Sequence, residues 1–141
     1  MFLGEFEYKV DAKGRVPIPP KYRRLLRDEV VLTQGIEKCI TAYPVSEWKK
    51  LAATLTTSSI TPSKVRKLNR AIFATAFTIL IDRQGRVALA SPLRQHAEIE
   101  DDVVVAGANT YFEIWNKANW EAEKAESSRQ AWQIIESLER H

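Results

Sequence analysis

The sequence predicts an α+β protein, a small β-barrel formed by two repeats and wrapped by short helices. The first observation is a duplication: "DAKGR" at residues 11–15 returns as "DRQGR" at residues 82–86, an offset of 71. The second is an alternation of apolar and polar residues before each copy, the period-2 pattern of a half-buried strand. The third is a proline-initiated, helix-like segment soon after the first copy. A solenoid generally needs three or more repeats, so we expect these two halves to complete each other.

The first repeat begins with a strand and a tight corner. In "FEYKVD", Phe6, Tyr8 and Val10 alternate with polar residues, which predicts a strand with one buried face. Residues 11–15, the first corner, follow. Asp is expected to accept hydrogen bonds from backbone N–H groups there, and Gly adopts a positive φ without steric cost. "RVPI" then resumes the strand, and "PPKYRRLL" predicts a helix that starts at a proline.

The second repeat carries the same elements. "AFTILID" places Phe77, Ile79 and Ile81 in the same phase, although Leu80 makes this strand apolar on both faces. Residues 82–86, the second corner, follow, and "RVAL" resumes the strand. The same fold is therefore expected on both sides of the duplication.

Further strands and helices complete each repeat. "EVVLTQG" and "DDVVVAGA" are β-branched runs ending at Gly, and "KCITAY" and "TYFEIW" are their expected hairpin partners. One inserted residue, an offset of 72, aligns Val31 with Val103. "PVSEWKKLAATL" and "NKANWEAEKA" are predicted helices, with Ser46 and Asn116 as N-caps.

The segments outside the repeats are predicted to be mainly helical. "TTSSITPSKVRKLNRAIF" reads as a linker followed by a helix that opens at Thr61-Pro62. In "SSRQAWQIIESLER" an apolar stripe contains Ala131, Ile135 and Leu138, which we expect to dock on the protein's own barrel rather than form a free partner helix. The chain thus divides into a first repeat over 5–50, a linker and helix over 51–75, a second repeat over 76–122 and a C-terminal helix over 123–141.

Basic residues concentrate around the two corners. The net charge is only +3, yet residues 9–27 hold seven Lys and Arg against one acid, and so do residues 64–94. Because the rest of the chain is acidic, this distribution predicts a basic face that attracts a polyanion.

The sequence indicates no enzyme, metal or cofactor. His96, His141 and Cys39 lack metal-ligand spacing, and no phosphate-binding glycine loop or nucleophile elbow occurs. Cys39 is expected to be a buried, inert thiol. Apolar runs fall short of the ~20 residues that span a bilayer, and the start lacks signal-peptide features. We expect a cytoplasmic protein without a small-molecule substrate.

The motifs together resemble the MraZ family, two-repeat members of the AbrB-like superfamily. The similarity runs to about residue 120 through "MFLGEFE", "DAKGRVPIPPKYR", "YPVSEW", "DRQGRV" and "FEIWNKANW". It implies a double-split, swapped-hairpin β-barrel in a nucleoid-associated transcriptional regulator. It further implies binding to repeated boxes upstream of the division and cell-wall gene cluster, including its own promoter, and ring-shaped homo-oligomers. The second repeat departs from the family pattern, with "LASPLR" where the first has "IPPKYR".

Two arginines are the principal expected contacts with double-stranded DNA. Arg15 and Arg86 each follow a glycine corner, where we expect an exposed guanidinium to bind phosphate oxygens or a guanine edge. Neighbouring contacts are expected from Lys13, Arg83 and Gln84. Candidate backbone contacts lie further back, at Lys21, Arg23 and Arg94. The turns themselves are organised by Asp11, Gly14, Asp82 and Gly85.

Two alternatives stay open at this point. A ring-forming structural or interaction protein that reads no specific DNA would share these patterns. Phe2 and Leu3 are either subunit-interface anchors or, slightly favoured, part of a strand tucked into the same chain's barrel. The tryptophans at 48, 115, 120 and 132 are better explained by packing than by stacking on single-stranded bases.

Overall fold

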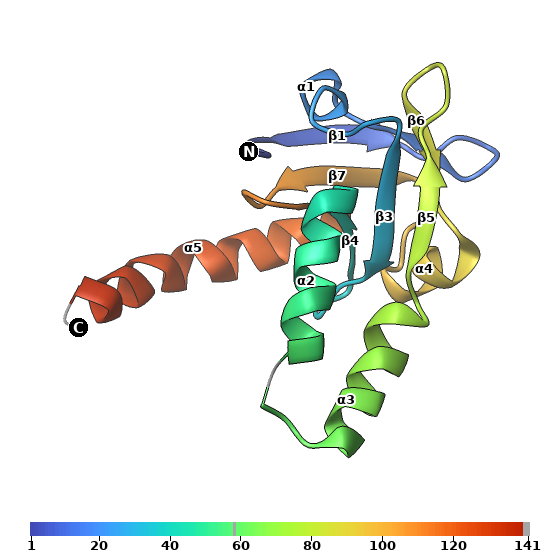
Figure 1. Cartoon of the computed structure of the whole chain (residues 1–141). Helices are drawn as coiled ribbons and strands as arrows, with labels where there is room; N and C mark the ends of the chain where they lie inside the picture. The colour runs from blue at the N-terminus through green and yellow to red at the C-terminus, as the bar shows by residue number, and fades with distance from the viewer. Residues whose placement is uncertain (58, 140–141) are drawn as a thin grey trace.

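A computed structural model describes residues 1–57 and 59–139. The first half of the chain contains four strands and two helices (Figure 1). In chain order they are β1 (Glu5–Lys9), β2 (Arg15–Pro17), α1 (Pro20–Arg23), β3 (Glu29–Gln34), β4 (Cys39–Tyr43) and α2 (Val45–Thr57). A helix α3 (Pro62–Leu68) and a π-helical turn η1 (Asn69–Phe73) connect the repeats.

The second half of the chain has the same order of elements. It contains β5 (Phe77–Leu80), β6 (Arg86–Ala88), α4 (Ser91–His96), β7 (Asp102–Gly107), β8 (Phe112–Asn116) and α5 (Lys117–Glu139). Of the two predicted N-caps, Asn116 is confirmed and Ser46 is wrong. Asn116 accepts a hydrogen bond from the Asn119 amide at 3.1 Å, as expected for an N-cap, whereas α2 begins at Val45 and leaves Ser46 inside its first turn.

The two repeats exchange strands. A six-stranded antiparallel sheet has the order β1-β7-β8-β4-β3-β5, and a second sheet contains only β2 and β6. Because β1 pairs with β7 and β5 pairs with β3, each repeat supplies an edge strand to the hairpin of the other. The predicted α+β class is confirmed, with antiparallel sheets and several helices.

The strand register corrects one predicted alignment. Tyr8 pairs with Val103, and its repeat counterpart Ile79 pairs with Val30. Val103 therefore corresponds to Val30, an offset of 73, and the alignment with Val31 was wrong by one residue. Runs of adjacent valines look the same at either offset, so only the pairing distinguishes them.

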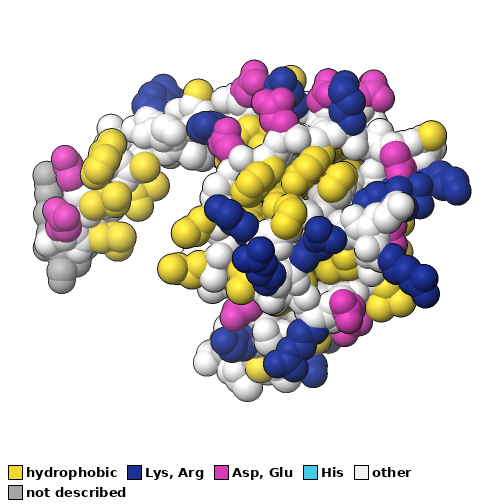
Figure 2. Space-filling view, turned by 90° about the horizontal axis from the view of Figure 1, so that it is seen from above, with side chains coloured by type: hydrophobic (Ala, Val, Ile, Leu, Met, Phe, Trp, Pro, Cys, Tyr) yellow, Lys and Arg dark blue, Asp and Glu magenta, His cyan; other side chains and the backbone are white. Residues whose placement is uncertain are grey.

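Helix α5 extends away from the sheets (Figure 1). The prediction that its apolar stripe docks on the same chain's barrel was wrong: Ile135 and Leu138 are 41% and 70% exposed, and Trp132 and Ile134 are exposed as well. Figure 2 shows this extended arm with apolar side chains grouped on its surface. Periodicity identified the apolar face but could not identify what covers it. The predicted end of the C-terminal helix, residues 140–141, lies outside the described part of the chain.

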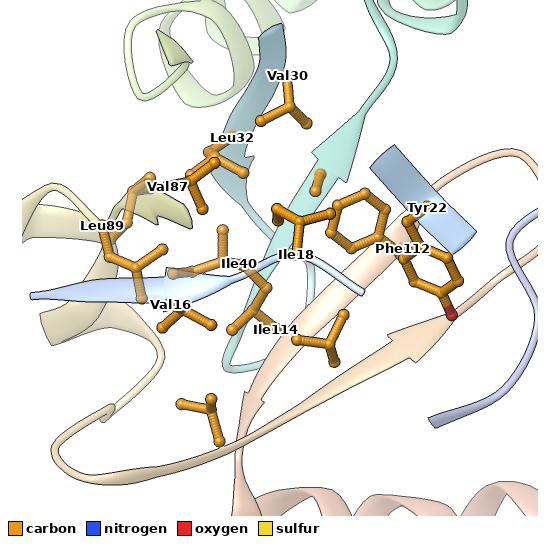
Figure 3. Close-up of a cluster of buried hydrophobic side chains, with 14 of the residues drawn as sticks. Val16, Ile18, Tyr22, Val30, Leu32, Ile40, Val87, Leu89, Phe112 and Ile114 are labelled. Carbon is orange, nitrogen blue, oxygen red and sulfur yellow. The ribbon is translucent and has the colours of Figure 1, made fainter. Parts of the chain in front are cut away.

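The core lies between the large sheet and the β2–β6 pair (Figure 3). Val16 and Val87 are register partners in that pair and are fully buried. Equivalent residues of the two repeats, Ile18 and Leu89, are also buried beside them. An aromatic group closes one end, with the ring centroids of Tyr22 and Phe112 5.1 Å apart. The two corners thus emerge from short strands whose central valines are fully buried.

The N-terminal segment and three tryptophans pack within the chain. Phe2 is buried with its ring centroid 5.1 Å from that of Tyr22, as the favoured alternative expected, while Leu3 is exposed. Trp48 packs on Phe73, and Trp115 on Trp120, with centroid distances of 5.3 and 5.8 Å. Packing therefore accounts for all the tryptophans except the exposed Trp132.

Candidate nucleic-acid interface

The first corner is closed by hydrogen bonds to one carboxylate. Asp11 Oδ1 accepts the backbone N–H groups of Lys13 and Arg15, both at 2.9 Å. Asp11 Oδ2 accepts Arg15 Nε at 2.8 Å. Gly14 takes a φ of +76° and donates its N–H to the Asp11 carbonyl at 3.0 Å. This left-handed conformation favours glycine.

The second corner repeats this geometry nearly atom for atom. Asp82 Oδ1 accepts the amides of Gln84 and Arg86 at 2.9 Å, and its Oδ2 accepts Arg86 Nε at 2.9 Å. Gly85 has a φ of +77°. The duplicated sequence therefore encodes a duplicated structure, in which each Asp fixes both its turn and the stem of its Arg.

Both carboxyl groups are held in the charged form. The backbone N–H of Arg15 is the largest influence lowering the pKa of Asp11, and the backbone N–H of Arg86 does the same for the pKa of Asp82. Hydrogen bonds to a carboxylate favour ionisation. The turns are thus fully formed at neutral pH, with an Asp–Arg ion pair in each.

The fold places the corners side by side. Between β2 and β6, Arg15 is the register partner of Ala88, and Arg86 is the partner of Pro17. Arg86 Nη1 lies 3.8 Å from Asp11 Oδ2, which links the second corner to the first. Two arginines 71 positions apart in sequence therefore share one small region of surface.

Neither arginine projects freely into solvent. The Arg15 and Arg86 side chains are only 28% and 27% exposed, so the expectation that both guanidinium groups are exposed was wrong. Each Nε donates a hydrogen bond to an Asp carboxylate, so the two Nη atoms form the outer end of each guanidinium group. A ligand would meet an arginine that is already oriented.

Exposed polar residues surround this pair. Lys13 lies at the tip of the first corner, and Arg83 and Gln84 at the tip of the second. An open groove beside the second corner is lined by residues that include Pro20, Arg23, Arg24, Asp82 and Arg83. Seen from above in Figure 2, Lys and Arg side chains lie across the face, and acidic side chains are most numerous along one edge, with others scattered over the view. This charge distribution suits a polyanion.

The arginines behind the corners occupy unexpected positions. Arg23 lies against Gly85 of the other repeat, and Arg94 lies against Gly14. Lys21, by contrast, is exposed on α1. Arg23 and Arg94 are 71 positions apart and so occupy equivalent positions in the two repeats. The sequence could not reveal their crossed contacts, because these depend on how the repeats pair.

The remaining His and Cys side chains in the described part of the chain have structural surroundings. Cys39 is fully buried, and burial is the main cause that raises the pKa of its thiol. His96 Nε2 lies 3.1 Å from the Gly35 carbonyl oxygen, a structural contact, and His141 is outside the described residues. Within residues 1–57 and 59–139, no group of three or more His, Cys, Asp and Glu side chains is arranged to bind a metal. No helix in this part of the chain is both long and apolar enough to cross a membrane.

The chain resembles one family along most of its length. A family described as "MraZ protein, putative antitoxin-like" matches residues 1–70 and 72–137. A transcriptional regulator MraZ from Dehalococcoides mccartyi strain BAV1 is 56% identical, with 100% of both chains covered. Its counterpart from strain 195 is 54% identical over 99% of each chain. The transcriptional regulator MraZ of Acetivibrio thermocellus is 39% identical over 98% of this chain and 96% of its own.

Proposed function

Because the chain belongs to the MraZ family, we propose that it is a sequence-specific DNA-binding transcriptional regulator, not an enzyme. We propose that it acts in the cytoplasm, at the nucleoid, on repeated boxes upstream of the division and cell-wall gene cluster, including its own promoter. The names of its relatives support the regulatory role. The observation that carries DNA binding is the pair of Asp-x-x-Gly-Arg corners side by side on a basic face.

The proposed contacts follow from the geometry of the corners. Arg15 and Arg86 present the outer ends of their guanidinium groups to phosphate oxygens or to guanine O6 and N7. Lys13, Arg83 and Gln84 extend the contact at the tips, and exposed Lys21 contacts the DNA backbone. Asp11 and Asp82 are turn organisers, because a carboxylate facing phosphate would repel it. The strand exchange supports a double-split, swapped-hairpin barrel as the scaffold, with residues 5–50 and 76–122 as its two repeats.

A homo-oligomer, in the form of a ring, is the second part of the proposal. The exposed apolar residues of α5 support it, since apolar groups grouped on an extended helix favour burial against another chain. A head-to-tail interface closes into a ring when its rotation allows. Several pairs of corners on one particle would then bind repeated boxes together, with a gain of about 10²–10⁴ in affinity.

The proposed oligomer can be tested by introducing a negative charge into the apolar face of α5. Ile134→Glu is expected to lower the particle mass measured by light scattering while circular dichroism stays unchanged, because Ile134 makes no core contact. Gln133→Glu, which adds the same charge beside it, serves as the matched control. An unchanged mass for Ile134→Glu would remove this helix from the interface.

DNA binding is tested by removing both arginines. The variant Arg15→Ala/Arg86→Ala is expected to lose specific binding to DNA from its own upstream region, with fold and particle mass retained. Arg66→Ala/Lys67→Ala removes two charges from α3 and should bind nearly as well as the wild type. Normal operator binding by the corner variant would refute the proposal.

The structural alternative is tested by salt. If several phosphates are neutralised, log affinity should fall steeply with log salt concentration, by about 0.9 per phosphate contact. A flat response, together with intact rings, would favour a ring-forming protein that reads no specific DNA.

A further inference from the structure

Each corner is supported by an arginine from the opposite repeat. A Cβ placed on Gly85 would lie 2.7 Å from Arg23 Cδ and closer still to the Arg23 guanidinium. A Cβ placed on Gly14 would lie 3.3 Å from Arg94 Cζ. Arg23 follows the first corner in sequence but covers the second, and Arg94 does the reverse.

Backbone hydrogen bonds follow the same crossed pattern. The Ile18 N–H donates to the Gly85 carbonyl at 2.8 Å, and the Leu89 N–H donates to the Gly14 carbonyl at 2.9 Å. Arg94 is itself fixed, because its Nε donates to the Leu89 carbonyl at 3.0 Å. Each glycine is therefore enclosed by a strand and an arginine of the other repeat, and both glycines are buried.

Arg23 and Arg94 are only partly exposed, unlike the neighbouring Arg24, which is exposed. A guanidinium against a glycine limits the positions that the corner can adopt. A larger residue at position 85 would overlap Arg23, and one at position 14 would crowd Arg94. The residue after each glycine is Arg86 or Arg15. The contacts of Arg23 and Arg94 with the two glycines can therefore control the orientation of Arg86 and Arg15.

We propose that Arg23 and Arg94 are positioning residues that act through the opposite corner, Arg23 on Arg86 and Arg94 on Arg15. This inference rests on the proposed function, since it assigns a role within DNA recognition. It makes the two repeats interdependent: neither corner has its DNA-binding shape without the arginine of the other repeat. The competing role is a direct contact between Arg23 or Arg94 and a DNA phosphate.

Double-mutant cycles on operator affinity distinguish these roles. Residues that act through one another are coupled, whereas independent DNA contacts contribute additively. Arg23→Ala should weaken binding strongly in the wild type, and its effect should shrink by about threefold or more in the Arg86→Ala background. The cycle with Arg15→Ala should show less coupling. Arg94→Ala should be coupled more strongly to Arg15→Ala than to Arg86→Ala. Arg24→Ala should be coupled equally weakly to both.

The variant Arg23→Lys adds a second criterion. Lysine keeps the positive charge but has no planar group to lie against Gly85. A phosphate-contact role predicts that Lys restores most of the binding, and the positioning role predicts that it does not. Additive cycles, equal coupling to both corners, or full rescue by Lys would each overturn the inference.

Amide exchange tests the same contact without DNA. Arg23→Ala should accelerate exchange at Gly85 and Arg86 while leaving Gly14 and Arg15 near their wild-type rates. If the wild type fails to bind its upstream DNA, the proposed function fails, and exchange still decides whether Arg23 supports the second corner. Unchanged exchange at Gly85 and Arg86 would refute that support.

Discussion

Replacing Tyr22 with Phe gives a stability test with a defined pH dependence. The Tyr22 hydroxyl donates toward the carbonyls of Leu3 and Gly4, at 2.9 and 3.0 Å, and ties the N-terminal segment to α1. The variant keeps the buried ring but removes this donor. Loss of one such hydrogen bond should lower the free energy of unfolding at pH 7 by about 1 kcal/mol.

The same hydroxyl makes the wild type sensitive to alkali. Burial raises the pKa of Tyr22 from 10.0 to about 12. The folded state therefore resists ionisation, so this stability is present in full below pH 10 and is lost as the pH rises toward 12. A shift of this size is worth about 1.4 kcal/mol by pH 11 and about 2.7 kcal/mol above pH 12. The variant has no phenol at this position and should overtake the wild type near pH 11.

Urea unfolding of both proteins between pH 7 and 11.5 measures this crossing. All other groups titrate in both proteins, so the difference between the two free energies isolates Tyr22. Tyr8→Phe is the control, because Tyr8 is only half-buried and its change should be smaller. A difference that stays constant across the range would refute the assignment of the alkaline loss to the Tyr22 hydroxyl.

Three further predictions concern other parts of the molecule. Arg15→Ala should weaken operator binding more than Arg86→Ala in fluorescence anisotropy, because more basic residues surround the first corner; equal losses would contradict this asymmetry. Gly107→Ala should lower the free energy of unfolding in urea by about 1–3 kcal/mol, because the new Cβ would lie 2.7 Å from the Leu3 backbone nitrogen. An unchanged urea midpoint would show that the N-terminal segment moves freely. Cys39 should react with an aromatic disulfide reagent only after unfolding, since the thiol is fully buried and burial raises its pKa; equally fast labelling of the native protein would indicate that the strand opens.

Local chemistry explains what the sequence could predict. Asp11 and Gly14 specify a turn through hydrogen bonds and φ preferences that act within five residues, and the same holds for Asp82 and Gly85. The alternation around Phe6 likewise sets which side of its strand faces inward. These features need no knowledge of the rest of the chain.

Long-range strand pairing explains what the sequence could not predict. Pairing β1 with β7 buries the same residues as pairing within one repeat would, so alternation alone cannot reveal strand exchange. The contact of Arg23 with Gly85 depends on that exchange and was missed for the same reason. The partial burial of Arg15 was also missed, because the Asp that organises the turn also draws the guanidinium back.

Each corner and the helix that follows it form one arm of the proposed DNA-binding surface, and the sequence difference between "IPPKYR" and "LASPLR" leaves the backbone nearly the same at the start of the two helices. Pro19 and Ala90 occupy the same helix-capping position, with φ and ψ of −51° and 135° against −59° and 141°. The Arg23 and Arg94 amides donate to the carbonyls of these two residues at the same distance, 3.1 Å.

The two arms differ in the number of positively charged side chains. Gln84, Pro92 and Gln95 stand at the positions of Lys13, Lys21 and Arg24, so the second arm lacks three cations of the first, and it gains one, Arg83, at the position of Ala12. Because Asp11 and Asp82 hold their arginines in the same way, we expect unequal DNA binding by the two arms to arise from this difference in charge. Adding lysine at position 84 should therefore reduce the difference between the arms, and a difference that persists unchanged in Gln84→Lys would place its cause in the corner backbone instead.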